Sequence, residues 1–158
     1  AQQQVYGEFL IPGLLNDAIL SDMQKSVPYT PNEDGIETPR YIYANYFLAR
    51  KLAELDRTAI LKKLSSKHPV KLFTNNPTPQ LPEVENMGAI DYYKIMPLVF
   101  QHSKINLNIT LRSIQKGIPL RAFDIMGSGG FLLTNYQEDF LNYFVPGEDF
   151  IYYSSSTT

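Results

Sequence analysis

The 158-residue chain is predicted to be an α/β domain in which helices cover both faces of a parallel sheet, a three-layer arrangement. Strand-like and helix-like segments alternate along its second half, most clearly over 103–134. Apolar residues make up 44% of the chain, which provides for one sizeable core at this length.

The first third of the chain is predicted to be helical. Apolar residues at helical spacing indicate a helix over 13–25, and a loop rich in proline and glycine follows over 28–39. A second helical pattern runs over 41–67. Asp56 is expected to cap a separate helix within that pattern, because a fresh apolar face begins just after it.

The middle of the chain alternates short strands with loops. Residues 70–74 form an apolar strand, and a proline-rich polar loop follows over 75–82. Another short strand is predicted over 88–92. A helix over 97–103 begins at Pro97, which suits the first turn of a helix.

The segment 103–134 carries the strongest pattern. Residues 105–111 alternate between apolar and polar, as a strand does. Gly117 and Pro119 then interrupt the chain before a short helix over 120–126 and a new strand over 131–134. This order places a helix N-terminus just past the carboxyl end of a strand, where anionic ligands bind in open α/β sheets.

The glycines of 127–130 do not form a phosphate-binding loop. Such a loop follows a strand and opens a helix, whereas these glycines close a helix and precede a strand. They are therefore expected to cap the helix and to make a tight turn. A helix over 138–143 and a strand over 150–153 complete the predicted elements.

Composition excludes several classes of protein. The net charge of −2 is too small to indicate a nucleic acid or a membrane surface as partner, and no apolar run is long enough to span a bilayer. No cysteine is present, which excludes disulfides and thiolate metal sites and fits a cytoplasmic location. No metal-ligand spacing is found either. Because the chain begins at Ala1 and ends in a run of Ser and Thr, it is expected to be one domain of a longer protein.

The helix over 120–126 offers the best candidate site. The helix is opened by Gly117, Ile118 and Pro119. The unpaired backbone N–H groups at its start form a positively polarised tip, which favours a phosphate group. Arg121 would clamp the same anion, and Asp124 lies about 7–8 Å further along at the helical rise. That offset suits a diphosphate at the tip and a ribose hydroxyl at Asp124. From spacing alone, an ordinary Arg121–Asp124 surface ion pair is favoured instead.

Other polar residues near this helix have two possible roles. Asn106 and Asn108 stand in a strand that should be apolar, so their amides either pin neighbouring loops or reach the ligand crevice near Arg112. Loop pinning is favoured. Tyr92, at the end of a predicted strand, either stacks on a nucleobase or packs in the core, and the core role is favoured.

With these residues laid out, 90–153 resembles the CgeB-like glycosyltransferases, a branch of the group 1 (GT-B) superfamily. The motifs SKINLN, GIPLR, FDIMGSGGF and PGEDFIYY carry the resemblance. It implies the carboxyl-terminal, Rossmann-like half of a two-domain enzyme, which binds a nucleotide-diphospho-sugar donor. The missing amino-terminal half would hold most of the acceptor site.

The resemblance also implies roles for individual residues. The superfamily has two acidic residues with seven residues between them, and the second falls on Asp124, where it would hold the ribose hydroxyls. The first falls on Lys116, which is not acidic, so the donor-sugar contacts and the stereochemical outcome stay open. The superfamily's basic pair has no counterpart. Lys116, Arg112 and Arg121 are candidates to stabilise the leaving diphosphate in its place, without a metal ion.

The sequence thus predicts a helical extension or hinge over 1–39, a nucleotide-sugar-binding domain over 40–153 and a disordered tail over 154–158. The expected function is donor binding in a hexosyltransferase-like glycosyltransferase that is inactive as this fragment and needs no cofactor besides its donor substrate. The alternative is a non-catalytic, degenerate glycosyltransferase-like module for protein interaction in spore-surface assembly or maturation. A third possibility is a receiver-like or flavodoxin-like domain, and the missing acidic cluster and aspartyl phosphorylation site disfavour the receiver.

Overall fold

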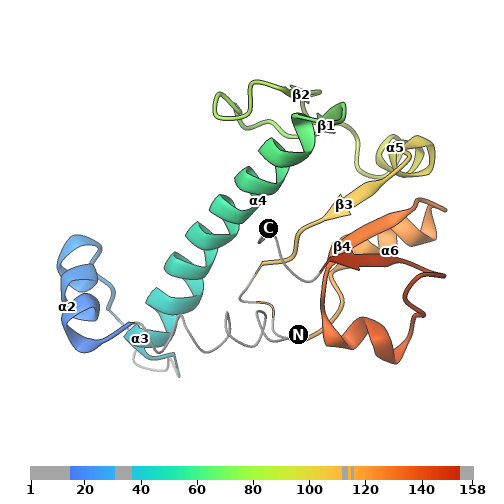
Figure 1. Cartoon of the computed structure of the whole chain (residues 1–158). Helices are drawn as coiled ribbons and strands as arrows, with labels where there is room; N and C mark the ends of the chain where they lie inside the picture. Colours follow the sequence, from blue (N-terminus) through green and yellow to red (C-terminus); the bar gives the residue numbers. More distant parts are fainter. Residues whose placement is uncertain (1–14, 31–36, 112–113, 115, 154–158) are drawn as a thin grey trace. The chain divides into compact units, whose positions relative to one another are not determined.

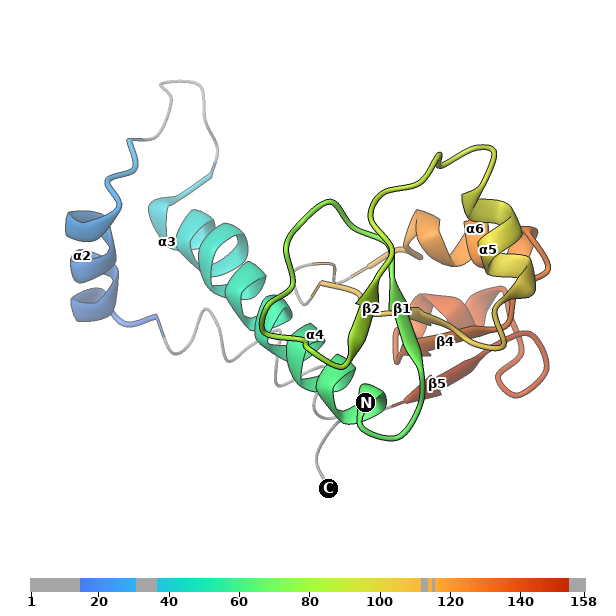
Figure 2. The same ribbon diagram turned by 90° about the horizontal axis from the view of Figure 1, so that it is seen from above.

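A computed structural model of the chain describes residues 15–30, 37–111, 114 and 116–153 (Figures 1 and 2). The chain divides into two compact units. The first unit comprises Ala1–Glu54 and Leu111–Gln115, and the second comprises Leu55–Thr110 and Lys116–Thr158. The predicted boundary between residues 39 and 40 stays a prediction, and the predicted tail over 154–158 lies outside the described residues.

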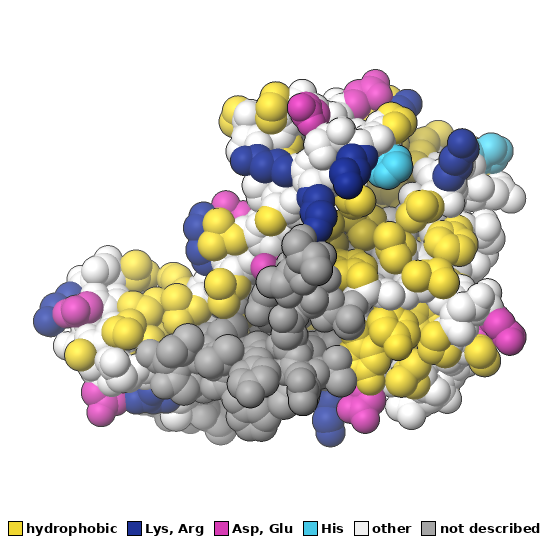
Figure 3. Space-filling model, viewed as in Figure 1, with side chains coloured by type: hydrophobic (Ala, Val, Ile, Leu, Met, Phe, Trp, Pro, Cys, Tyr) yellow, Lys and Arg dark blue, Asp and Glu magenta, His cyan; other side chains and the backbone are white. Residues whose placement is uncertain are grey.

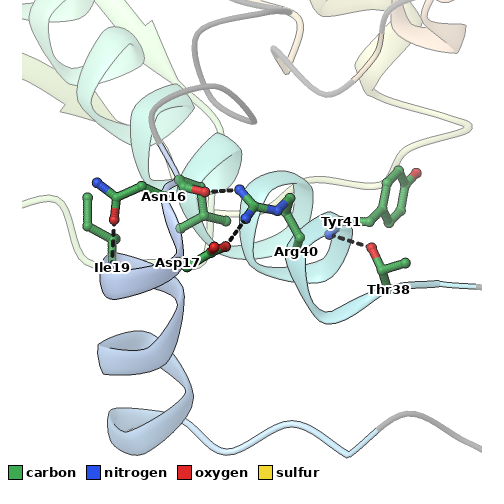
Figure 4. Close-up of polar contacts among 7 residues, drawn as sticks. Asn16, Asp17, Ile19, Thr38, Arg40 and Tyr41 are labelled. Carbon is green, nitrogen blue, oxygen red and sulfur yellow. Dashed lines mark hydrogen bonds and ion pairs between the residues drawn. The ribbon is translucent and has the colours of Figure 1, made fainter.

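The first unit is helical, as the apolar spacing predicts. Its elements are α2 (Asp17–Ser26), α3 (Pro39–Ile42), the π-helix η1 (Tyr43–Leu48) and the start of α4 (Ala49–Ser65). Polar side chains fix the ends of two of these helices, as Figure 4 shows. Asn16 caps α2 and Thr38 caps α3, each by accepting a backbone N–H three residues further on. The guanidinium group of Arg40, near the start of α3, donates to the carboxylate of Asp17 in α2.

The prediction that Asp56 caps a second helix is wrong. Asp56 lies in the interior of α4, which continues from Ala49 to Ser65 without a break. The 17 residues of this helix include neither glycine nor proline, so nothing in the local sequence ends it. The fresh apolar face after Asp56 therefore continues the same helix.

The second unit contains five short parallel strands in two sheets. β1 (Val70–Leu72) pairs with β2 (Val84–Asn86), and β3 (Asn106–Asn108), β4 (Leu132–Asn135) and β5 (Ile151–Tyr153) form the other sheet in that order. The helices between them are α5 (Met96–His102), α6 (Leu120–Gly127) and the 3₁₀-helix η2 (Glu138–Asn142). The predicted α/β class with parallel strands is confirmed.

The predicted strand over 88–92 is wrong, because the chain turns there. Gly88 has a φ of +74°, and the carboxylate of Asp91 accepts the backbone N–H groups of Tyr93 (2.9 Å) and Lys94 (2.7 Å). A side chain that takes up nearby N–H groups competes with strand pairing. The strand of this region is β2, a few residues earlier. The predicted helix over 138–143 is helical, but of the 3₁₀ type.

One core holds the second unit together. α5 and α6 lie next to each other (Figure 2), and α6 contacts β3 and β4. Buried side chains from these elements, from η2 and from the residue before β5 form one cluster: Phe100, Ala122, Ile125, Leu132, Phe140 and Phe150. The other face of the sheet presents Leu107, Leu133 and Ile151 in register. That row is less buried, and apolar side chains reach the surface in this part of the unit (Figure 3).

The glycines after α6 cap that helix, as predicted. Gly129 has a φ of +74° and donates its N–H to the carbonyl of Met126 at 2.9 Å. Gly130 donates to the carbonyl of Ile125, also at 2.9 Å. These two bonds define a Schellman motif, which ends the helix and leads directly into β4.

Gly130 also allows α5, α6 and β3 to meet closely. A Cβ atom on this residue would lie 2.7 Å from the amide nitrogen of Asn106 and 2.7 Å from the carbonyl oxygen of Phe100. The Asn106 amide itself donates to the carbonyls of Phe100 (2.9 Å) and Phe131 (3.3 Å). The loop-pinning interpretation of Asn106 is therefore confirmed: its amide joins the end of α5 to the start of β4.

We expect Gly130→Ala to lower the free energy of unfolding by about 1–3 kcal/mol, the usual cost of overpacking a tight site. The matched control is Gly127→Ala, because a Cβ there would meet no atom within 4 Å. The control should leave stability unchanged or raise it by up to about 1 kcal/mol, since alanine favours a helix over glycine. Urea denaturation of both variants measures the difference. Equal stabilities would show that the close approach does not constrain residue 130.

Candidate functional site

The start of α6 follows the carboxyl end of the β3 segment, as the sequence pattern predicts. Gly117 has a φ of +89°, Pro119 occupies the N-cap position, and the helix begins at Leu120. No side chain of the described residues caps this helix. Its first backbone N–H groups are therefore available to an anion.

One group of the predicted tip is already occupied. The backbone N–H of Gly117 donates to the carboxylate of Asp139 in η2. The next residue, Phe140, is fully buried in the core, so η2 holds Asp139 firmly in this position. The protein thus places a negative charge of its own beside the turn that leads into α6.

Asp124 is engaged by a residue from another element. The hydroxyl of Tyr92, in the turn before α5, donates to the carboxylate of Asp124 in α6. The Asp124 residue is half-buried, whereas Tyr92 is 45% exposed. The Arg121–Asp124 ion pair that spacing alone favours is not among the salt bridges of the described residues. The structure therefore brings Tyr92, rather than Arg121, onto this carboxylate.

The surroundings of Tyr92 favour the protonated form of its hydroxyl, which can donate a hydrogen bond. The hydrogen bond to Asp124 raises the pKa of the Tyr92 hydroxyl above its ordinary value, and partial burial and the charge of Asp124 act in the same direction. The cation of Arg121 opposes this rise in pKa. The phenol is consequently neutral at physiological pH and fixes one side of the Asp124 carboxylate.

The remaining predicted site residues differ in exposure. Lys116 and Arg121 are exposed, so both cations face solvent. Ile118 is partly buried and packs against the core cluster of the second unit, and Pro119 is half-buried. Arg112 lies outside the described residues.

A buried polar cluster lies where β3 and β4 end. The amide of Asn108 donates to the hydroxyls of Thr134 (2.9 Å) and Thr110 (3.1 Å). The Thr110 hydroxyl donates to Gln137 at 3.1 Å, and its backbone N–H donates to Asn135 at 2.7 Å. Asn108 therefore pins the segments that follow the two strands, as the favoured interpretation predicts, and polar side chains satisfy one another there.

Tyr153 is a further polar residue at the carboxyl end of the sheet, and sequence analysis does not single it out. Its hydroxyl is buried without a hydrogen-bond partner within the described part of the chain. Burial, with a smaller effect from the charge of Asp56, raises the pKa of this hydroxyl to about 12. The sequence signals are its position as the last residue of a predicted strand and of the PGEDFIYY motif.

The described residues offer neither a cluster of metal ligands nor a membrane-spanning helix. No group of three or more His, Asp or Glu side chains within 15–30, 37–111, 114 and 116–153 is placed to hold a metal ion. Over the same ranges, no helix is both long and apolar enough to cross a membrane.

Comparison with known families identifies the class of protein. The sequence profile of a family described as glycosyl transferase-like matches residues 50–158, which is more than half of the chain. The chain therefore belongs to the glycosyl transferase-like family. No curated protein and no solved structure gives a significant match. The matched range includes the whole α/β unit with α6, Asp124 and Asp139.

The buried hydroxyl of Tyr153 predicts a loss of stability at alkaline pH. Its pKa is about 12 in the folded chain, against 10.0 ordinarily, so the unfolded chain loses this proton first as the pH rises. This group does not change stability below pH 10, and stability should fall as the pH rises from 10 towards about 12. Urea unfolding at a series of pH values should show this decline for the wild type.

Tyr153→Phe serves as the comparison for that series. The variant should lack this part of the decline. At neutral pH it should be more stable by about 1 kcal/mol, because it removes a buried hydroxyl that no described residue pairs. Parallel pH dependences of the wild type and the variant between pH 10 and pH 12 would contradict the prediction.

Proposed function

We propose that this chain is the donor-binding half of a CgeB-like glycosyltransferase of the group 1 (GT-B) superfamily, acting on a nucleotide-diphospho-sugar. Membership of the glycosyl transferase-like family is the observation that carries the proposal. The geometry that supports it is a carboxylate, Asp124, held on the helix whose N-terminus is capped by no described side chain.

The chemistry of the reaction explains why such a helix is useful. When the bond between the sugar and the diphosphate breaks, negative charge develops on the leaving diphosphate. Backbone N–H groups and cations that are already in position stabilise that charge without reorganisation. In our proposal the backbone N–H groups of Ile118, Leu120 and Arg121 bind the diphosphate, and the side chains of Arg121 and Lys116 supply the positive charge. Arg112 remains a further candidate cation.

Asp124 has a different part in the proposal. A carboxylate accepts hydrogen bonds from hydroxyl groups, and ribose offers two on adjacent carbons. Asp124 lies one and a half turns behind the tip, at about 7–8 Å along the axis, which suits the distance from a diphosphate to a ribose. Tyr92 contributes to this part of the site by donating its hydroxyl hydrogen to the Asp124 carboxylate. Stacking of its ring on a nucleobase stays a prediction.

The rest of the proposal concerns the longer protein. The acceptor site is assigned to an amino-terminal half, and the isolated chain is expected to bind donor without turning it over. The identity of residues 1–39 as an extension or hinge, the hexosyltransferase-like activity and the cytoplasmic location are part of the same proposal.

A non-catalytic module is the second candidate, and two observations favour it. Lys116 stands where the resemblance implies an acid, and Asp139 occupies the N–H of Gly117 with a negative charge. In such a site the loss of the acid removes a donor-sugar contact and the charge of Asp139 repels a diphosphate, while the fold is retained. This candidate would use the domain for protein interaction, of the kind expected in spore-surface assembly.

Isothermal titration of the chain with UDP, GDP and their sugars tests the proposal. We expect binding by at least one of them, and a loss of affinity of about tenfold for Asp124→Asn, because a hydrogen bond to a charged group is lost. Glu148→Gln is the matched control, since it removes one exposed carboxylate elsewhere in the same unit. A folded sample that binds none of these compounds at millimolar concentration would contradict the proposal and favour the second candidate.

The variant Asp139→Asn distinguishes the donor-binding function from the non-catalytic module through the charge beside α6. Asparagine keeps an oxygen to accept the N–H of Gly117, but it removes the negative charge beside the proposed diphosphate position. We expect the affinity for the nucleoside diphosphate to rise by about threefold at low salt, because a repulsion is removed. The control is Glu138→Gln, which removes the adjacent exposed charge. Equal affinities for the two variants would place the diphosphate away from this turn.

A further inference from the structure

We infer that Tyr92 is a positioning residue that orients the Asp124 carboxylate for a vicinal diol, the ribose of the donor. The inference rests on the proposed function and deepens it. Its starting point is the hydrogen bond from the Tyr92 hydroxyl to Asp124 Oδ2, which joins the turn before α5 to α6.

The backbone around Tyr92 is well fixed. The Asp91 carboxylate accepts the N–H groups of Tyr93 and Lys94, and the Asp91 carbonyl accepts those of Ile95 (3.1 Å) and Met96 (3.0 Å). α5 follows at once and packs against α6. The backbone that carries Tyr92 is therefore held in place, so its hydroxyl has a defined position beside Asp124. A long flexible side chain would not define that position as well.

The hydrogen bond leaves half of the carboxylate open. Tyr92 donates to Oδ2, and no hydrogen bond within the described residues uses Asp124 Oδ1. A carboxylate has about four acceptor positions on its two oxygens. With one position filled by Tyr92, the plane of the group is set and the other oxygen can accept from both hydroxyls of a diol.

Tyr93 provides an internal comparison. Its ring is 87% exposed and stands edge-to-face against that of Tyr92, with 5.4 Å between ring centroids. It has the same chemistry and nearly the same place in the chain, yet of these two tyrosines it is Tyr92 whose hydroxyl donates to the Asp124 carboxylate. Any effect that belongs to the Asp124 contact should therefore be absent when the hydroxyl of Tyr93 is removed.

The test compares ribose with a sugar that lacks both hydroxyls. The affinities of the wild-type chain, Tyr92→Phe and Tyr93→Phe are measured by calorimetry for UDP and GDP and for their 2′,3′-dideoxy counterparts. We expect Tyr92→Phe to bind the ribonucleotide about five- to tenfold more weakly and the dideoxynucleotide as the wild type does. Tyr93→Phe should match the wild type with both. Tyr92→Phe should also add no further loss to Asp124→Asn.

Each other result overturns the inference. An equal loss for the ribonucleotide and the dideoxynucleotide would make Tyr92 a general contact, and no loss would make its hydroxyl irrelevant. A gain in affinity would mean that Tyr92 blocks Asp124. A wild-type chain that binds no nucleotide would reject the proposed function as well, so the two failures can be told apart.

Discussion

The position of α6 on the sheet depends on the close approach of the Asn106 amide to the backbone of Gly130. The amide joins the end of α5 to the start of β4, and the absence of a side chain at residue 130 gives it room. α6 ends at the same place in its Schellman motif. α5 and α6 are thus fixed to one strand junction, and with them Tyr92 and Asp124.

The site contains an unusual balance of charge. Asp139 and Asp124 each accept a hydrogen bond from another part of the second unit, one from a backbone N–H and the other from a phenol. The two cations, Lys116 and Arg121, face solvent. Exposed cations suit an anionic ligand that arrives from outside, and a carboxylate such as Asp124 suits its hydroxyl groups. They equally suit a domain that has kept its fold and lost its ligand, which is why Asp139 separates the two proposed functions.

Much of the fold could be predicted because it depends on local periodicity. The alternation in 105–111 and the interruption at Gly117 and Pro119 locate β3 and α6, since strand and helix patterns and their breaks are properties of neighbouring residues. The two wrong predictions, the strand over 88–92 and the helix cap at Asp56, also rest on local patterns. Asp91 takes up nearby N–H groups and turns the chain where a strand is predicted, and no breaker stops α4 at Asp56.

The contacts between residues of the candidate site could not be predicted from local periodicity. The partners of Asp124 and Gly117 stand 32 and 22 residues away in sequence, and no periodicity connects them. Even the Arg121–Asp124 spacing, which favours a local ion pair, is overridden by the tertiary contact with Tyr92. Candidate residues could be named from the motif around α6, but their partners depend on how α5 and η2 pack against it.

Backbone amide chemical shifts of the chain, followed by NMR during titration with UDP or GDP, test the central claim most directly. If α6, positioned by the Asn106–Gly130 junction, carries a donor site, the largest changes should fall on the amides of 118 and 120–124, with further changes at 91–93. Changes confined to residues outside these two segments, or no changes at saturating nucleotide, would contradict a donor site at α6.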